Sequence, residues 1–203
     1  MSFAGLPAPV RRLIESRVVF HALRRPMGWG TVPRVEAALD LRPGERLLDI
    51  GCGTGTFAPS AAGFYLGIDP ALDALRFARA RFGDGRRSFA AMRAGALALR
   101  PGSFDKALMA NVAHHLGEAE LDELLCAVRE VVRGPLVLLD AALDIANPIE
   151  RALLRHDRGE HVRTVAALRP LLARRYVIEH EETFHNTLRV VPQVLFRLVA
   201  GRH

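Results

Sequence analysis

The chain has 203 residues, half of them hydrophobic, and a formal net charge of +6. This length and apolar content predict a single folded domain, residues 1–203, and exclude a disordered or fibrous chain. The sequence has neither an apolar run long enough to span a membrane nor an apolar N-terminal segment typical of a signal peptide, so we expect a cytoplasmic protein. Two cysteines, Cys52 and Cys126, do not make a disulfide framework.

Helix and strand patterns alternate along the sequence. In chain order we expect helices over 10–25 and 31–39, a strand over 46–50, a helix over 56–62, a strand over 65–69, a helix over 71–82, strands over 88–94 and 106–110, a helix over 118–132, a strand over 136–139, helices over 148–156 and 164–173, and strands over 176–183 and 188–199. Pro192 falls inside the last strand, where it predicts a bulge or an edge position. Repeated strand–helix units that end in a hairpin predict an α/β fold with a mostly parallel sheet.

The first strand ends in Asp49 and runs directly into Gly51, Gly53 and Gly55. Glycines let the backbone turn sharply and approach a ligand, since no Cβ intervenes. A helix that follows over 56–62 would turn its free N–H groups toward that ligand. Strand, acid, glycine turn and helix together predict a nucleotide-type cofactor site, although a tight turn without a ligand is the alternative. The glycine spacing is not that of a dinucleotide fold, and no phosphate-binding loop motif is present.

A second strand, 65–69, also ends in an acidic residue. Asp69 lies 20 positions after Asp49, a spacing at which a carboxylate can accept hydrogen bonds from both ribose hydroxyls. Because Pro70 and a predicted helix follow, Asp69 could instead be a helix N-cap, and both roles are compatible.

These motifs carry a family resemblance. Asp49-Ile50-Gly51-Cys52-Gly53-Thr54-Gly55, with Gly-Ile-Asp-Pro at 67–70, resembles the class I S-adenosylmethionine-dependent methyltransferases, of the small-molecule, methyltransferase-11-like type. The segment 103–116 resembles the fourth-strand region of that family. The resemblance covers roughly residues 45–140 and implies a Rossmann-like sheet of about seven strands with helices on both faces and an antiparallel C-terminal hairpin. It implies cofactor-binding roles for Asp49, Gly51, Cys52, Gly53, Gly55, Asp69, Pro70, Gly95, Ala96 and Asn111.

The implied reaction is transfer of a methyl group from S-adenosylmethionine to an oxygen, nitrogen or carbon of a small molecule, with S-adenosylhomocysteine as product. Residues 1–40 would form an N-terminal helical cap, 45–140 the cofactor-binding core, 141–175 an acceptor-side insertion and 176–200 the hairpin. Two departures favour an alternative, a degenerate cofactor-binding or scaffolding protein. Gly95 stands where relatives often have an Asp for the adenine amino group, and only 14 positions separate Gly55 from Asp69, which shortens the first helix.

Candidate catalytic residues lie in two polar segments. His114 and His115 follow the fourth strand, and His156, Arg158 and His161 lie in the charged stretch 155–163. A base is needed only if the acceptor must lose a proton, and any of these histidines could supply it. Arg158 and Arg163 could clamp a carboxylate or phosphate, although a solvated loop with local salt bridges explains such a stretch equally well.

Other partners are less favoured. Adjacent histidines point apart and no second ligand cluster is near, so we expect no metal site. The basic residues gather in the flanks 1–46 and 151–203, which weakly favours an anionic acceptor or surface. A nucleic-acid substrate is not expected, because the stacking motif of base methylases is absent and aromatic residues make up only 6% of the chain. The sequence does not indicate an oligomeric state.

Overall fold

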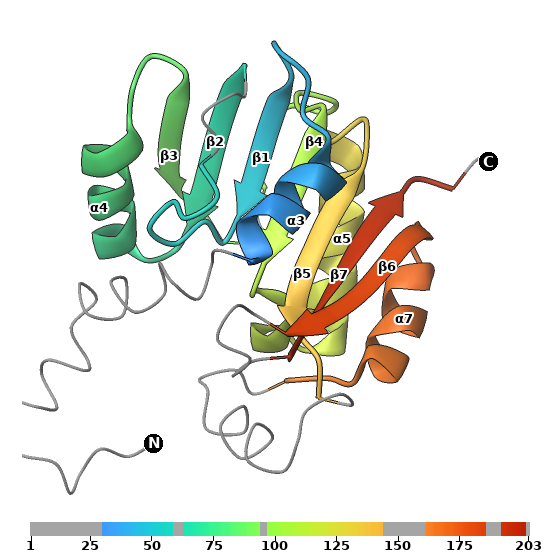
Figure 1. The fold of residues 1–203 in the computed structure, drawn as a ribbon. Helices are drawn as coiled ribbons and strands as arrows, with labels where there is room; N and C mark the ends of the chain where they lie inside the picture. Colours follow the sequence, from blue (N-terminus) through green and yellow to red (C-terminus); the bar gives the residue numbers. More distant parts are fainter. Residues whose placement is uncertain (1–29, 59–62, 94–96, 144–160, 186–191, 202–203) are drawn as a thin grey trace, which may run out of the picture.

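The computed structural model describes residues 30–58, 63–93, 97–143, 161–185 and 192–201. Their centre is one sheet of seven strands in the order β3-β2-β1-β4-β5-β7-β6 (Figure 1). The strands are β1 (Arg46–Ile50), β2 (Phe64–Asp69), β3 (Arg87–Ala91), β4 (Lys106–Ala110), β5 (Leu136–Ala141), β6 (Val177–His185) and β7 (Pro192–Val199). Strands β1 to β5 pair in parallel, whereas β7 is antiparallel to both β5 and β6. The predicted mixed sheet with a C-terminal hairpin is therefore confirmed.

Helices cover both faces of this sheet. The described helices are α3 (Thr31–Leu39), α4 (Leu72–Phe82), α5 (Glu118–Val131) and α7 (Val165–Ala173), with a 3-10 turn, η2 (Ala113–His115), between β4 and α5. Side chains of α3 and α4 share one apolar cluster with the sheet, and those of α5 and α7 share the other. None of the described helices is both long and apolar enough to cross a membrane.

Alternation along the strands explains the two clusters. Leu48 and Ile50 of β1 face α5, and Leu47 faces α3 and α4 from the opposite side. Strands β4 and β5 are apolar almost throughout, as expected of parallel strands that are covered on both faces. Asp49 is an acidic residue buried within this pattern, and it lies on the same face as Leu47.

Two local predictions need correction. The helix expected over 56–62 does not begin there, because residues 53–57 form turns and Ala58 has no regular structure. Pro192 takes neither a bulge nor an edge position. It is the first described residue of β7, where a missing N–H is tolerated, and β7 lies between β5 and β6. The helices expected over 10–25 and 148–156 lie outside the described residues.

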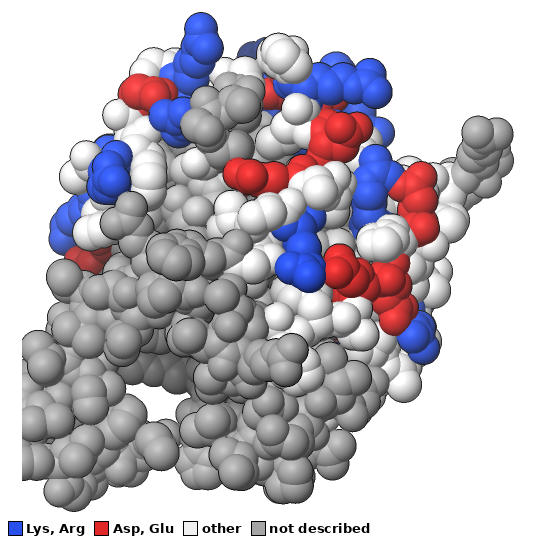
Figure 2. Space-filling view, in the orientation of Figure 1, with Lys and Arg blue, Asp and Glu red and all other residues white. Residues whose placement is uncertain are grey.

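Arginines from both basic flanks are paired with acids of the edge strand β6. Glu179, Glu181 and Glu182 of the edge strand β6 each form an ion pair with an arginine, which comes from β7, α7 and α3 respectively. Figure 2 accordingly shows acidic and basic side chains interspersed over α3 and the hairpin. The positive charges of these three arginines are therefore balanced by neighbouring acids.

Candidate functional site

The carboxyl ends of β1, β2 and β4 meet at one edge of the sheet. From β1 the chain crosses to β2 on one side, and later returns to place β4 on the other side. In open α/β sheets, ligands bind at the carboxyl ends of the strands where the strand order reverses in this way. Asp49 pairs in register with Gly67, so Asp69 lies two residues further along the neighbouring strand. The two acidic residues are therefore at the same edge, as the sequence predicts.

The turn after β1 is held open by backbone geometry. Gly51 and Gly53 have φ values of +70° and +53°, in the left-handed region that L-residues avoid. A Cβ at Gly51 would overlap Cγ2 of Val112, whereas a Cβ at Gly53 would meet nothing within 4 Å. The first glycine thus allows close packing against the end of β4, and the second presents bare backbone to open space.

The N–H groups of this turn form hydrogen bonds within the protein. Gly51 and Cys52 both donate to the carbonyl of Ile68, Gly55 donates to the carbonyl of Cys52, and Gly53 donates to Asp69 Oδ2 at 2.9 Å. These four N–H groups are therefore not available to a ligand, and residues 56–58 do not form the helix that was expected to supply free ones. What the turn offers a ligand is close approach, together with the acidic side chains beside it.

Asp69 is the more heavily bonded of the two acids. Besides Gly53, the N–H of Ala71 donates to its Oδ1 at 2.7 Å. Asp69 is not the N-cap of the next helix, because α4 begins at Leu72 with Ala71 in the cap position. A carboxylate oxygen can accept a second hydrogen bond, so these contacts leave capacity for ribose hydroxyls.

Asp49 has an acceptor without a partner. Its side chain is buried, and the Tyr65 hydroxyl donates to Oδ2 at 2.6 Å. Among the described residues, Oδ1 is the buried side-chain atom that lacks a hydrogen bond. Burial raises the pKa of Asp49 to about 7, with the charge of Asp69 adding to the rise and the Tyr65 bond opposing it. An orphaned buried carboxylate oxygen beside an open glycine backbone fits the cationic amino-acid end of S-adenosylmethionine.

Three further predicted residues line the same edge. Cys52 is buried, which raises the pKa of its thiol, so Cys52 remains protonated. Asn111 directly follows β4 with φ +57°, a conformation that Asn tolerates better than most residues, and its N–H donates to the carbonyl of Leu139. Pro70 lies exposed between β2 and α4. Gly95 and Ala96 lie outside the described residues.

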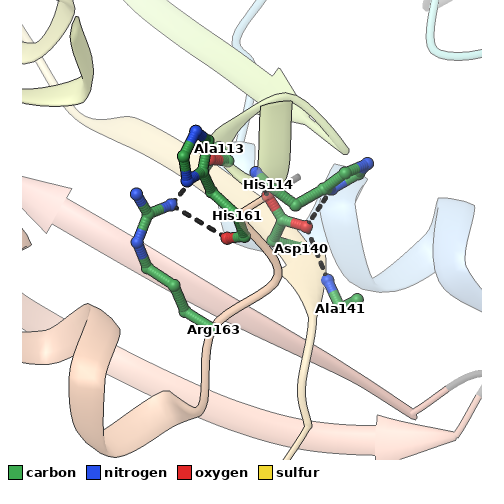
Figure 3. Close-up of polar contacts among 6 residues, drawn as sticks. All are labelled: Ala113, His114, Asp140, Ala141, His161 and Arg163. Atoms are coloured by element: carbon green, nitrogen blue, oxygen red, sulfur yellow. Dashed lines mark hydrogen bonds and ion pairs between the residues drawn. The ribbon is translucent and has the colours of Figure 1, made fainter. Parts of the chain in front are cut away.

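A buried His–Asp pair stands at the ends of β4 and β5 (Figure 3). Nδ1 of His114 lies 2.5 Å from Oδ1 of Asp140, and the His114 N–H donates to Oδ2 of the same carboxylate. Asp140 is 2% exposed and also accepts from the Ala141 N–H. His115 is exposed, with its ring 4.1 Å from that of His114. The ring of His114 is therefore fixed by a buried carboxylate.

The segment 161–163 forms hydrogen bonds with η2 and the residue after it (Figure 3). The N–H of His161 donates to the carbonyl of His114, and the Arg163 guanidinium donates to the carbonyls of Ala113, Leu116 and His161. This commitment to backbone carbonyls leaves Arg163 poorly placed to clamp an anion. His156 and Arg158 lie outside the described residues.

Sequence reasoning missed Tyr65 and Asp140. Both act through contacts between neighbouring strands or loops that no local motif records. Asp140 did carry a signal, since it is an acid at the end of an otherwise apolar strand, as Asp49 and Asp69 are. Tyr65 gave none, because an aromatic residue at the start of a strand is ordinary.

Comparisons with known proteins agree with this geometry. Residues 47–134 match a family model described as a methyltransferase domain. No curated protein matched the chain.

Among solved structures, an S-adenosylmethionine-dependent methyltransferase from Mesorhizobium loti is similar, with 22% identity and a TM-score of 0.68 over 85% of this chain and 97% of that one. A chain from the complex of the Haloferax volcanii Trm112 methyltransferase activator has 14% identity and a TM-score of 0.76, over 96% of this chain and 98% of that one. The geranyl diphosphate C-methyltransferase of Streptomyces coelicolor, solved with Mg²⁺, geranyl diphosphate and S-adenosylhomocysteine, has 12% identity and a TM-score of 0.71, over 85% and 79% of the two chains.

Proposed function

We propose that the chain is a class I S-adenosylmethionine-dependent methyltransferase, which methylates a small-molecule acceptor through a hydroxyl or amine group. The match of residues 47–134 to a methyltransferase-domain model and the shared fold support this proposal. The observation that carries the cofactor side of the proposal is the buried Asp49 carboxylate with one unpartnered oxygen. The observation that favours an O–H or N–H acceptor is the His114–Asp140 pair at the neighbouring strand ends.

The cofactor would be held by residues at the ends of β1, β2 and β4. Asp49 Oδ1 would accept from the ammonium of the methionine end, and Asp69 would accept from the ribose hydroxyls with its remaining lone pairs. Gly53 would let the ligand approach the backbone. Asn111, and Gly95 and Ala96 outside the described residues, complete the proposed set. When bound, S-adenosylmethionine supplies a methyl group that its sulfonium charge already activates.

The protein's contribution to the reaction is alignment, exclusion of water and removal of a proton. With Asp140 ionised, Nδ1 of neutral His114 carries the hydrogen and donates it to the carboxylate, so Nε2 is the basic nitrogen. As the new bond to the methyl carbon forms, Nε2 would take the proton from the acceptor's oxygen or nitrogen. Asp140 would stabilise the resulting imidazolium. His115, His156 and His161 remain the other candidate bases.

The proposal that the acceptor is anionic has narrower support. Arg163 is engaged with backbone carbonyls, which leaves Arg158, outside the described residues, as the candidate clamp. The structural neighbour from Streptomyces coelicolor was solved with an anionic diphosphate. This part of the proposal therefore depends on Arg158.

The alternative is a protein that binds the cofactor without transferring a methyl group. The Gly95 departure and the absence of a helix over residues 56–58 favour it, whereas Asp49, the glycine turn and Asp69 oppose it. Turnover of cofactor labelled in its methyl group, with a metabolite extract as acceptor source, separates the two functions. Labelled product is expected, and its absence despite cofactor binding would favour the alternative.

Calorimetry with S-adenosylmethionine and S-adenosylhomocysteine tests the cofactor site directly, and failure to bind either would refute the proposal. For the base, His114→Gln and Asp140→Asn should each lower turnover by about 10²-fold or more while leaving cofactor affinity unchanged. His180→Gln is the matched control, because His180 is exposed on the edge strand β6 and is not among the candidate bases.

A further inference from the structure

A buried phenol sits beneath the proposed cofactor site, where no motif assigns a role to it. Tyr65 is the second residue of β2 and pairs in register with Leu47 of β1. Side chains alternate along a strand, so Tyr65, Gly67 and Asp69 lie on one face of β2, beside Leu47 and Asp49 of β1. Gly67, which pairs with Asp49, has no side chain, and the Tyr65 hydroxyl reaches Asp49 Oδ2 at 2.6 Å.

Because of this contact, the two carboxylate oxygens of Asp49 have different hydrogen-bond surroundings. Oδ2 is held by Tyr65, while Oδ1 has no hydrogen-bond partner among the described residues. Because a carboxylate is planar, fixing one oxygen also fixes the direction of the other. The ring of Tyr65 is itself fixed, since it is 1% exposed and packs edge-on against Phe89 with centroids 5.5 Å apart.

We propose that Tyr65 is a positioning residue, which orients Asp49 so that Oδ1 is the acceptor for the cofactor's ammonium group, and that binding is coupled to loss of a proton from Asp49. The inference rests on the proposed function and deepens it. In the free protein the buried acid holds a proton for part of the time near neutral pH. A cation needs the carboxylate form, so binding releases that proton to the buffer.

The surroundings of Asp49 favour this coupling. The titratable groups that face it from the described chain are the Tyr65 phenol, the Cys52 thiol and the Asp69 carboxylate. Helices α3 and α4, which cover this face, contribute apolar side chains to the adjoining core cluster. No described cation balances Asp49, and burial raises its pKa to about 7. The Tyr65 bond acts in the opposite direction, because it stabilises the ionised form.

Tyr65→Phe is the test variant, since it keeps the ring and removes only the hydroxyl. Tyr176→Phe is the matched control: Tyr176 is also buried, and its hydroxyl lies 3.4 Å from the carbonyl of Leu125, far along the sequence from the site. S-adenosylhomocysteine is the probe, because it carries the same amino-acid end and cannot react. Calorimetry from about pH 6 to about pH 9, in buffers of different ionisation enthalpy, reports both affinity and proton release.

We expect the affinity of the wild type to fall by up to about tenfold per pH unit below about pH 7, with net proton release. Tyr65→Phe should bind about tenfold more weakly at neutral pH, and the deficit should narrow toward about pH 9. A carboxyl carbon NMR titration of the free protein, with the Asp49 signal assigned by its absence in Asp49→Asn, should show a higher pKa in Tyr65→Phe. Tyr176→Phe should match the wild type in both measurements.

The outcomes separate two failures. Binding by Tyr65→Phe that equals the wild type at every pH, in a variant that remains folded, would overturn the role of Tyr65. A uniform loss at all pH values, with an unchanged Asp49 titration, would also overturn it, since packing alone would explain that result. Absence of binding by the wild type would instead refute the proposed function.

Discussion

Asp49→Asn should stabilise the protein at neutral and alkaline pH, although it removes a residue of the proposed site. The amide resembles the protonated acid in shape and can still accept from Tyr65 through its oxygen. It does not have to bear a buried negative charge. An ionised carboxylate in a low-dielectric environment is costly, and the rise of the Asp49 pKa from 3.8 to about 7 expresses that cost.

The size and sign of the effect follow from proton linkage. Between the unfolded pKa near 3.8 and the folded pKa of about 7, folded Asp49 is protonated and unfolded Asp49 is not. The folded state then binds more protons, so the stability contributed by this group is full at low pH and is lost as pH rises to about 7. At about 1.4 kcal/mol per pH unit, this shift of roughly three units amounts to about 4 kcal/mol.

Urea unfolding at several pH values measures the difference between variant and wild type. The gain in unfolding free energy of Asp49→Asn should grow by about 1.4 kcal/mol per pH unit between about pH 5 and about pH 7, and then level off. Asp73→Asn, which alters an exposed carboxylate on α4, is the control for loss of one negative charge. A difference between Asp49→Asn and wild type that does not change with pH would refute the argument, because Asp49 would then titrate as an ordinary acid.

Substitutions at three further positions test the geometry around the site. Gly51→Ala should lower the free energy of unfolding by about 2 kcal/mol or more, because the new Cβ meets Val112 and φ is +70°. Gly85→Ala, at an open turn, is the control. Equal melting temperatures of the Gly51→Ala and Gly85→Ala variants would contradict the steric argument. Arg163→Met keeps an apolar stem but removes the donors to the carbonyls around η2. It should lower the urea midpoint by the equivalent of about 1–3 kcal/mol. An unchanged midpoint would mean that water replaces those hydrogen bonds without loss of stability. Asn111→Gly should leave the thermal stability unchanged or raise it. Asn111→Val should lower the free energy of unfolding by at least about 1 kcal/mol, because φ at this position is +57°. The reverse order of stabilities would show that the left-handed conformation is not maintained.

Local patterns in the sequence account for most of the sheet and for the acidic residues at its edge. Strands β1 and β4 and helix α3 begin and end where their patterns predict. Asp49 and Asp69 are placed correctly because both follow apolar runs that must be parallel neighbours, and the ends of such strands meet at one edge. These features depend on residues close together in the chain.

The hydrogen-bond partners of those residues could not be predicted in the same way. The Tyr65–Asp49 contact depends on the register of β1 against β2, and the His114–Asp140 pair joins residues 26 positions apart. The carbonyl of Ile68 accepts hydrogen bonds from two N–H groups of the glycine turn because β2 ends beside the turn, and no local motif indicates these bonds. A sequence motif specifies which residues lie at the edge of the sheet, whereas the strand register specifies which of their atoms already form hydrogen bonds within the protein.

That occupancy distinguishes two acids that look equivalent in the sequence. Asp69 is partly exposed and receives an N–H on each oxygen, so its negative charge is stabilised before any ligand arrives. Asp49 is buried and receives one hydroxyl, so one oxygen is unsatisfied and the charge is costly. A cation offsets the energetic cost of the buried Asp49 charge directly, whereas a neutral hydroxyl offsets little of it. We therefore propose that the cationic end of the cofactor binds at Asp49 and the neutral sugar at Asp69, so the affinity for the cationic end should depend on pH through Asp49.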